Sequence, residues 1–95
     1  MALVWRAEAA DEFLSAVSWY DDQRSGLGDE FGTACQAALA LIESQPDLFP
    51  VVHGDIRRAL LRRFPYGMFY AVRGEDIVIL AVHHTRRDPR RWGRR

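Results

Sequence analysis

Two adjacent histidines, His83 and His84, are the residues of this chain best suited to acid–base chemistry. They directly follow residues 77–82, an uninterrupted apolar run with the composition of a buried strand. Histidine titrates near neutral pH, so either imidazole could serve as a general acid or base. Adjacent side chains on a strand point to opposite faces, so we expect one histidine to face the helices and the other to face the open side of the sheet. The alternative interpretation is one structural histidine and one solvated histidine.

Arginine supplies all thirteen basic residues of the chain, and several arginines occur in adjacent pairs. Planar guanidinium groups bind phosphate and carboxylate groups through paired hydrogen bonds. We therefore expect a surface that binds an acidic partner or a nucleic acid backbone. The residues assigned to this target-binding surface are Arg58, Arg62, Arg63, Arg86, Arg87, Arg90, Arg91 and Trp92.

The charges are divided along the sequence. Residues 1–55 carry ten acidic residues and two arginines, whereas residues 56–95 carry eleven arginines and three acidic residues. The formal net charge of zero hides this division. The division favours a charged partner, but it also allows the arginines to pair with the acidic residues of the same chain.

Neither a metal site nor a cofactor site is predicted. His53 has no other potential ligands at a suitable spacing, and no phosphate-binding or dinucleotide-binding glycine motif is present. A single cysteine cannot form an internal disulfide, so we expect Cys35 to be a small buried hydrophobic residue.

A chain of 95 residues is long enough for one domain, residues 1–95, with one hydrophobic core. No apolar run reaches the roughly 20 residues that a membrane span requires. The first residues do not have the pattern of a signal peptide. These features predict a soluble cytoplasmic protein that does not contact a membrane.

The first half of the chain is predicted to form a helical hairpin after a short strand at residues 3–6. Apolar residues recur at spacings of three and four in residues 8–24 and again from residue 29 to the residue before Pro46. Gly26 and Gly28 mark the connection between the two helices. We expect Trp19 and Tyr20 to pack as a pair against the sheet.

The second half is predicted to form an antiparallel meander after a loop at residues 47–55. The expected strands are residues 57–64, 68–73 and 77–82. On the first of them, Arg58 and Arg62 would share one face, with Arg57 and Arg63 on the other. The predicted fold is therefore α+β, in the order β-α-α-β-β-β, with an antiparallel sheet packed on the helical hairpin.

Residues 77–82 are apolar on both faces, which is unusual in an antiparallel sheet with one face in water. Two explanations are open. The strand is central in a curled sheet, or its second face is a binding surface that a partner covers. Strict alternation would place Ile77, Ile79 and Ala81 on one face. It would place Val78, Leu80 and Val82 on the other.

A series of residues along nearly the whole chain resembles the RelE/ParE superfamily of bacterial toxins from type II toxin–antitoxin systems. The resemblance is closer to the ParE side, and the expected fold is the same. The residues that carry it are Trp19-Tyr20, Gly26-Leu27-Gly28, Phe31, Pro46, Phe49-Pro50, Arg57-Arg58, Arg63-Phe64-Pro65-Tyr66, Tyr70, His83, Arg87-Asp88-Pro89 and Trp92.

The resemblance implies a toxin that inhibits bacterial growth and forms a hetero-oligomer with a cognate antitoxin. ParE-like members act by binding DNA gyrase and need no catalytic residues. RelE-like members cut messenger RNA on the ribosome, and in that case His83, His84 and Arg86 would be catalytic. The ribonuclease branch usually has an arginine at the position of Gly67, which favours the ParE side. A third possibility is a non-toxic binding module with the same fold.

Overall fold

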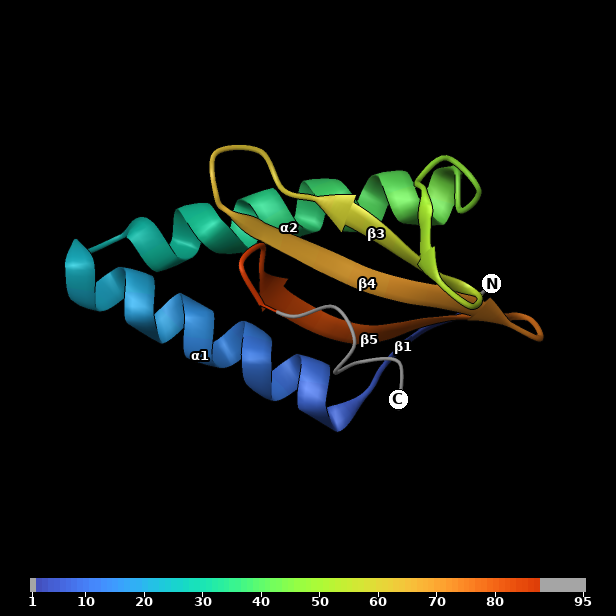
Figure 1. Cartoon of the computed structure of the whole chain (residues 1–95). Coiled ribbons are helices and arrows are strands. Elements are labelled where there is room, and N and C mark those ends of the chain that lie inside the picture. The colour runs from blue at the N-terminus through green and yellow to red at the C-terminus, as the bar shows by residue number, and fades with distance from the viewer. Residues whose placement is uncertain (1, 88–95) are drawn as a thin grey trace.

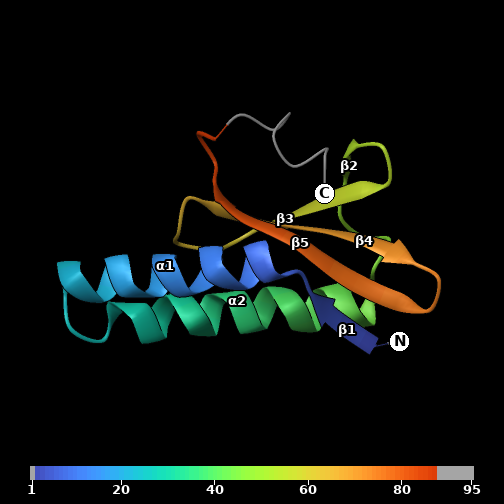
Figure 2. The ribbon, with the colours of Figure 1, turned by 90° about the horizontal axis from the view of Figure 1, so that it is seen from below.

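Two antiparallel helices lie on one face of a five-stranded sheet in the computed structural model, which describes residues 2–87 (Figure 1, Figure 2). The helices are α1 (Ala7–Gln23) and α2 (Leu27–Ser44). The strands are β1 (Ala2–Trp5), β2 (Val51–His53), β3 (Ile56–Leu60), β4 (Tyr66–Arg73) and β5 (Asp76–His84). The predicted α+β fold with a helical hairpin on a sheet is confirmed. Neither of these helices is long and apolar enough to cross a membrane.

The sheet has the strand order β1-β5-β4-β3-β2 and is mixed rather than antiparallel. Strands β2 to β5 pair in antiparallel fashion, as predicted for the meander. Strand β1, however, pairs in parallel with β5, so the expectation of a purely antiparallel sheet is wrong. The long connection through both helices brings the chain to the far edge of the sheet and permits this parallel pairing.

The predicted loop at residues 47–55 contains strand β2, which the sequence pattern did not indicate. The Arg57 guanidinium donates hydrogen bonds to the backbone oxygens of Asp47 and Phe49, at 3.2 and 2.7 Å. The Tyr70 hydroxyl donates to the backbone oxygen of Pro46 at 2.5 Å. These side chains hold the segment after α2 against the sheet, so that β2 can pair with β3.

Strand β3 ends at Leu60, four residues before the predicted end at Phe64. Arg63 adopts a left-handed backbone conformation with φ of 72°, which a regular strand does not contain. The expected alternation of Arg58 and Arg62 against Arg57 and Arg63 is therefore wrong, because Arg62 and Arg63 lie outside the strand.

A bulge in β5 changes the predicted alternation of its side chains. Ile79 is opposite Tyr70 and Ala81 is opposite Phe69, so Leu80 is an extra residue in the strand. After the bulge, Val82 belongs to the core on the helix side and Ala81 to the cluster on the other face. The predicted faces of Ala81 and Val82 are therefore exchanged.

Both faces of β5 are buried, and β5 is paired on both sides, as expected for a central strand. On the helix side it contributes to a core that includes Phe31, Met68 and Tyr70, each 0% exposed. The cluster on the opposite face is smaller and consists of Ile56, Phe69, Ala71, Val78, Leu80 and Ala81.

The predictions for Cys35 and Trp19 have different outcomes. Cys35 is 1% exposed within the core, and burial raises the pKa of its thiol to about 12, so it is the expected buried hydrophobic residue. Tyr20 is also in the core, but Trp19 is 55% exposed. The rings of Trp19 and Tyr20 meet edge to face, with their centroids 5.1 Å apart, so the predicted pair forms. Trp19 itself is not buried against the sheet, so that part of the prediction is wrong.

The two helices approach most closely at Gly28. A Cβ atom at this position would lie 2.6 Å from the backbone oxygen of Val17 and 2.8 Å from the Asp21 carboxylate. The same carboxylate accepts a hydrogen bond from the Gly28 amide at 2.7 Å, which satisfies one of the free N–H groups at the start of α2. The start of the hairpin thus depends on the absence of a side chain at residue 28.

Replacing Gly28 with alanine is expected to lower the free energy of unfolding by about 1–3 kcal/mol, because the Cβ must displace backbone. The matched control is Gly32→Ala on the same helix, where the nearest atom is 4.0 Å from the added Cβ. That variant should be unchanged or more stable, by up to about 1 kcal/mol, since alanine favours helix. Urea denaturation measures both. Equal stability of the two variants would contradict the close approach.

Candidate functional site

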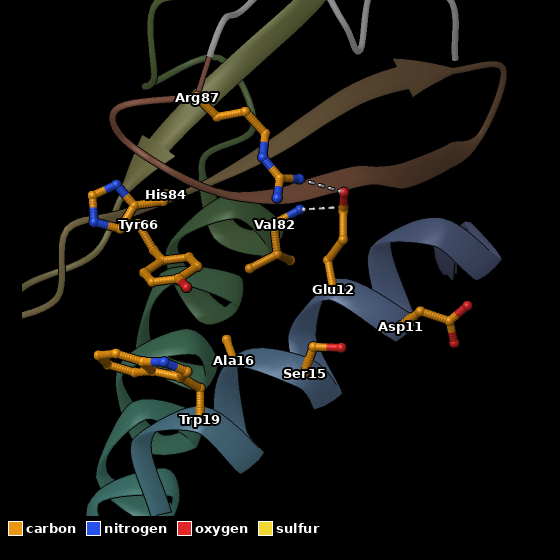
Figure 3. A pocket seen from close by; sticks show the side chains of 9 residues that line it. All are labelled: Asp11, Glu12, Ser15, Ala16, Trp19, Tyr66, Val82, His84 and Arg87. Carbon is orange, nitrogen blue, oxygen red and sulfur yellow. Dashed lines mark hydrogen bonds and ion pairs between the residues drawn. The ribbon is translucent and has the colours of Figure 1, made fainter. Parts of the chain in front are cut away.

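The candidate site begins where the pairing between β1 and β5 ends. The last hydrogen bond along this edge of β5 runs from the Arg6 amide to the Ile79 oxygen, at 2.9 Å. Strand β5 continues, and its Val82 amide donates instead to Oε1 of Glu12 on α1, at 3.1 Å (Figure 3). A side-chain carboxylate thus satisfies a strand edge that would otherwise have an exposed donor.

The second oxygen of the same carboxylate holds two further groups. Glu12 Oε2 lies 2.6 Å from His83 Nε2 and accepts a hydrogen bond from Arg87 Nη1 at 3.3 Å. The Glu12 side chain is only 16% exposed, which strengthens these charge-assisted contacts. Glu12 therefore connects α1 to the end of β5 and to the turn that follows.

The two histidines face opposite sides, as predicted, but their surroundings differ strongly. His83 is 2% exposed, and its ring centroid lies 5.7 Å from that of Phe69 on the face away from the helices. Its Nε2 is engaged with Glu12. Burial and this hydrogen bond favour a structural role for His83.

His84 is partly exposed and faces the helix side. Its Nδ1 accepts a hydrogen bond from the Arg86 amide at 3.1 Å, which leaves Nε2 as the ring nitrogen that can donate. Its ring centroid lies 5.4 Å from that of Tyr66. His84 therefore presents an N–H donor, and its remaining nitrogen is occupied by the backbone.

A groove of about 350 Å³ separates α1 from the ends of β4 and β5 (Figure 3). Its aromatic side chains are Trp19, Tyr66 and His84, and Figure 3 shows them on the same side of the groove. The remaining lining residues are Asp11, Glu12, Ser15, Ala16, Val82 and Arg87. The groove combines aromatic surface with carboxylates, so it suits a protein side chain better than a phosphate group.

The arginines expected at the target-binding surface gather at one end of the sheet. The amide of Thr85 donates to the oxygen of Pro65 at 2.8 Å, so the turn after β5 lies beside the connection between β3 and β4. This brings together two of the predicted arginine pairs, 62/63 and 86/87. Arg58 lies farther along the sheet, on the face away from the helices. The predicted residues Arg90, Arg91 and Trp92 lie outside residues 2–87.

Some of these arginines pair with acidic residues of the same chain, as the competing interpretation expected. Arg63 lies 2.7 Å from Glu30, and Arg87 contacts Glu12. Among residues 2–87, Arg58, Arg62 and Arg86 make no ion pair, and the last two are exposed. Part of the basic charge thus remains available to a partner.

Gly67 leaves the space that the Arg58 stem occupies. A Cβ atom at residue 67 would lie 3.2 Å from Cγ and 3.4 Å from Cδ of Arg58. The aliphatic part of the Arg58 side chain therefore fills the space above Gly67, where the ribonuclease branch would have the arginine side chain. Arg58 Nε is buried and has no hydrogen-bond partner within the described part of the chain.

Of the residues that line the groove, only His84 and Arg87 were predicted to belong to a site. Glu12 and Trp19 are the most important of those that were missed. Glu12 occurs in the first turns of a helix, where acidic residues are common for electrostatic reasons. Its contacts are separated from it by 70 or more residues in sequence, so no local pattern reveals them. The sequence did contain a signal that Trp19 is exposed. Tyr20, the next residue, occupies the helix position that faces the core, so Trp19 must point elsewhere.

Comparisons with known proteins find a family model and a solved structure that are similar to this chain. A family model described as "ParE toxin of type II toxin-antitoxin system, parDE" matches residues 3–89. A solved structure described as "Chromosomal ParDE TA system from P. aeruginosa" is similar, with a TM-score of 0.67 and 20% sequence identity. The similarity covers 88% of this chain and 95% of that chain, and at this identity it supports the fold alone. No curated protein matches this chain.

Replacing Glu12 with alanine is expected to lower the free energy of unfolding by about 2–4 kcal/mol, because it leaves the Val82 amide and His83 without this acceptor. The control is Asp11→Ala, the neighbouring exposed carboxylate, which should change stability by less than about 0.5 kcal/mol. Urea denaturation gives both values. A Glu12→Ala variant as stable as wild type would show that Glu12 does not anchor β5.

The ion pairs of Glu30 predict a pH dependence. Its hydrogen bond with Arg63, and then that with Arg24, lower the pKa of Glu30 below its usual value of 4.5. A depressed carboxyl pKa contributes stability above the unfolded-state pKa, and this contribution is lost as pH falls through the folded-state pKa. Wild type should therefore be more stable than Glu30→Gln at pH 7, and the difference should disappear in strong acid. A difference that stays constant with pH would contradict this assignment.

Proposed function

This chain belongs to the ParE toxin family of type II toxin–antitoxin systems, and from that membership we propose that it inhibits bacterial growth by binding a target protein. DNA gyrase is the first candidate for the target, as in ParE-like toxins generally. The observation that carries the proposal is the family match, which extends over residues 3–89. A cognate antitoxin would neutralise the toxin in the cytoplasm by forming a hetero-oligomer with it.

The environment of the histidines supports binding rather than RNA cleavage. A general base must reach the substrate with a free nitrogen. His83 is 2% exposed and hydrogen-bonded to Glu12, while Nδ1 of His84 accepts a backbone hydrogen bond. With Nδ1 of His84 occupied as an acceptor, its accessible Nε2 carries the proton and cannot accept one from a 2′-hydroxyl, and His83 is buried.

The arginines at the end of the sheet support an acidic binding partner. Arg62 and Arg86 are exposed and make no ion pair within residues 2–87. Guanidinium groups that are exposed and unpaired suit the carboxylate groups of a target or antitoxin.

A ribosome-dependent ribonuclease remains the second candidate, on one specific observation. His84 is partly exposed, carries its proton on Nε2, and is followed by the exposed Arg86. If Nδ1 of His84 exchanged its bond to the Arg86 amide for a proton, the resulting imidazolium could give its Nε2 proton to a leaving oxygen and return to the neutral ring, while the Arg86 guanidinium stabilised phosphorane charge. Arg86 would then be catalytic rather than target-binding.

Induced expression without an antitoxin should stop growth and reduce the negative supercoiling of a reporter plasmid before protein synthesis falls. Arg62→Ala combined with Arg86→Ala should restore colony formation by about tenfold or more, since both charges face solvent and are available to a partner. Arg24→Ala is the control, because Arg24 is exposed but already paired with Glu30. Immunoblots confirm equal expression of all three chains.

Other outcomes separate the alternatives. Rapid loss of protein synthesis with unchanged supercoiling would favour the ribonuclease, and a His84→Ala variant should then lose RNA cleavage. Normal growth of cells that express the folded wild-type chain would favour a non-toxic binding module. Growth arrest that persists with Arg62→Ala and Arg86→Ala would show that these arginines do not contact the target.

A further inference from the structure

The face of the sheet that turns away from the helices, here called the outer face, is buried. Among its side chains, Phe69 is 5% exposed and Leu80 is 0% exposed. His83, whose ring lies beside Phe69, is 2% exposed. An antiparallel sheet with one face in water exposes the large side chains of that face. The outer face is therefore covered, although both helices lie on the other side of the sheet (Figure 2).

The described part of the chain supplies only part of this cover. Within residues 2–87, Val52 on β2 is the partly buried hydrophobic residue that packs against the cluster of the outer face. The stem of Arg58 lies over Gly67 on the same face. Strand β5 is separated from β2 by two other strands, roughly 14 Å at 4.8 Å per strand. Val52 and Arg58 therefore do not explain why Leu80 is completely buried.

The remaining cover comes from the chain itself, because Leu80 is buried within a single chain. Met1 and residues 88–95 lie outside the described range. Met1 adjoins β1, at the edge of the sheet, and one residue is too short to reach across it. Residues 88–95 follow the turn after β5, which the Arg87 amide closes through a hydrogen bond to the His84 oxygen at 3.0 Å. They therefore begin at one end of the strand that has to be covered.

The length of this segment matches the surface to be covered. Residues 88–95 can span at most about 27 Å, and Trp92 can lie at most about 17 Å from Arg87. Along β5, Leu80 lies roughly 13 Å from His84, at about 3.3 Å per residue. A segment that turns back along β5 therefore brings Trp92 to the level of Leu80.

The chemistry of the outer face fits Trp92. All six residues of its cluster are apolar, whereas a nucleic acid requires basic or polar groups. Residues 88–95 contain one large apolar side chain, that of Trp92, together with four arginines. An indole ring buries a large apolar area and packs well against other rings, such as the pair formed by Phe69 and His83. Trp92 is therefore the part of this segment that matches the face.

We propose that residues 88–95 turn back over the outer face of the sheet and that Trp92 is their anchor, packed on Phe69 and Leu80. Trp92 is then part of the fold, in place of the target contact predicted from the sequence. The same cover closes the outer face to other ligands. The family match ends at residue 89, so family membership does not supply this role, and the inference does not depend on the target of the toxin.

Nuclear magnetic resonance of the full-length wild-type chain tests the contact directly. Nuclear Overhauser effects should connect the Trp92 ring with the methyl groups of Leu80 and Ala81. Ile42 is the matched control, because it is completely buried on the helix side and should show no contact with Trp92. Absence of contacts from Trp92 to both Leu80 and Ala81 would overturn the proposal. Contacts that appear only between differently labelled copies would show that a second copy supplies the cover, which would also overturn it.

Variants measure what the anchor contributes, and the wild-type spectra decide the question if one of them does not fold. Trp92→Ala should increase the fluorescence of a dye that binds exposed apolar surface at least about threefold, and it should shift the Leu80 methyl resonances. Trp92→Phe keeps an aromatic anchor and should stay close to wild type. Trp19→Ala removes an exposed tryptophan and should not increase dye binding. A folded Trp92→Ala chain with unchanged dye fluorescence and unchanged Leu80 resonances would refute the role of Trp92.

Discussion

The carboxylate of Glu12 is the interaction on which the arrangement of the site depends. Strand β1 is too short to cover the full length of β5, so the edge of β5 has hydrogen-bonding groups that need another partner. Glu12 supplies the acceptor for Val82 and also holds His83 and Arg87. Because one side chain binds the helix, the strand and the following turn, the groove between α1 and the sheet keeps a defined shape.

The order of the elements other than β2, and the core, were predictable because they follow from local patterns. The helix periodicity that identified Tyr20 and Phe31 as core residues is visible in any short window of sequence. Strand β2, the bulge at Leu80 and the contacts of Glu12 depend instead on partners that are distant in sequence. Arg57 reaches back across ten residues to hold the segment before β2, and Glu12 reaches across seventy. No local pattern specifies either contact.

The division of charge along the sequence is largely a division between the two layers of the fold. Eight of the thirteen acidic residues lie on the two helices, and most of the described arginines lie on the sheet and its connections. The helices and the sheet form separate layers (Figure 2). Internal pairs such as Arg63 with Glu30 neutralise part of this charge at the boundary. The remaining charges, Arg62 and Arg86 on one layer and Asp11 and Asp22 on the other, have opposite signs and lie on different elements. A single chain can therefore offer two partners surfaces of opposite sign.

The extra residue at Leu80 has a consequence for comparing this chain with its relatives. Because side chains alternate along a strand, one additional residue inverts the facing of everything that follows it. Which face of the sheet His83 and His84 point to therefore depends on the number of residues between them and the start of β5, including the extra residue Leu80. In a relative whose last strand lacks the bulge, the residue aligned with His83 would point into the groove and the one aligned with His84 away from it. Equivalence between such positions has to be assigned from strand register, since alignment columns alone would equate residues on opposite faces.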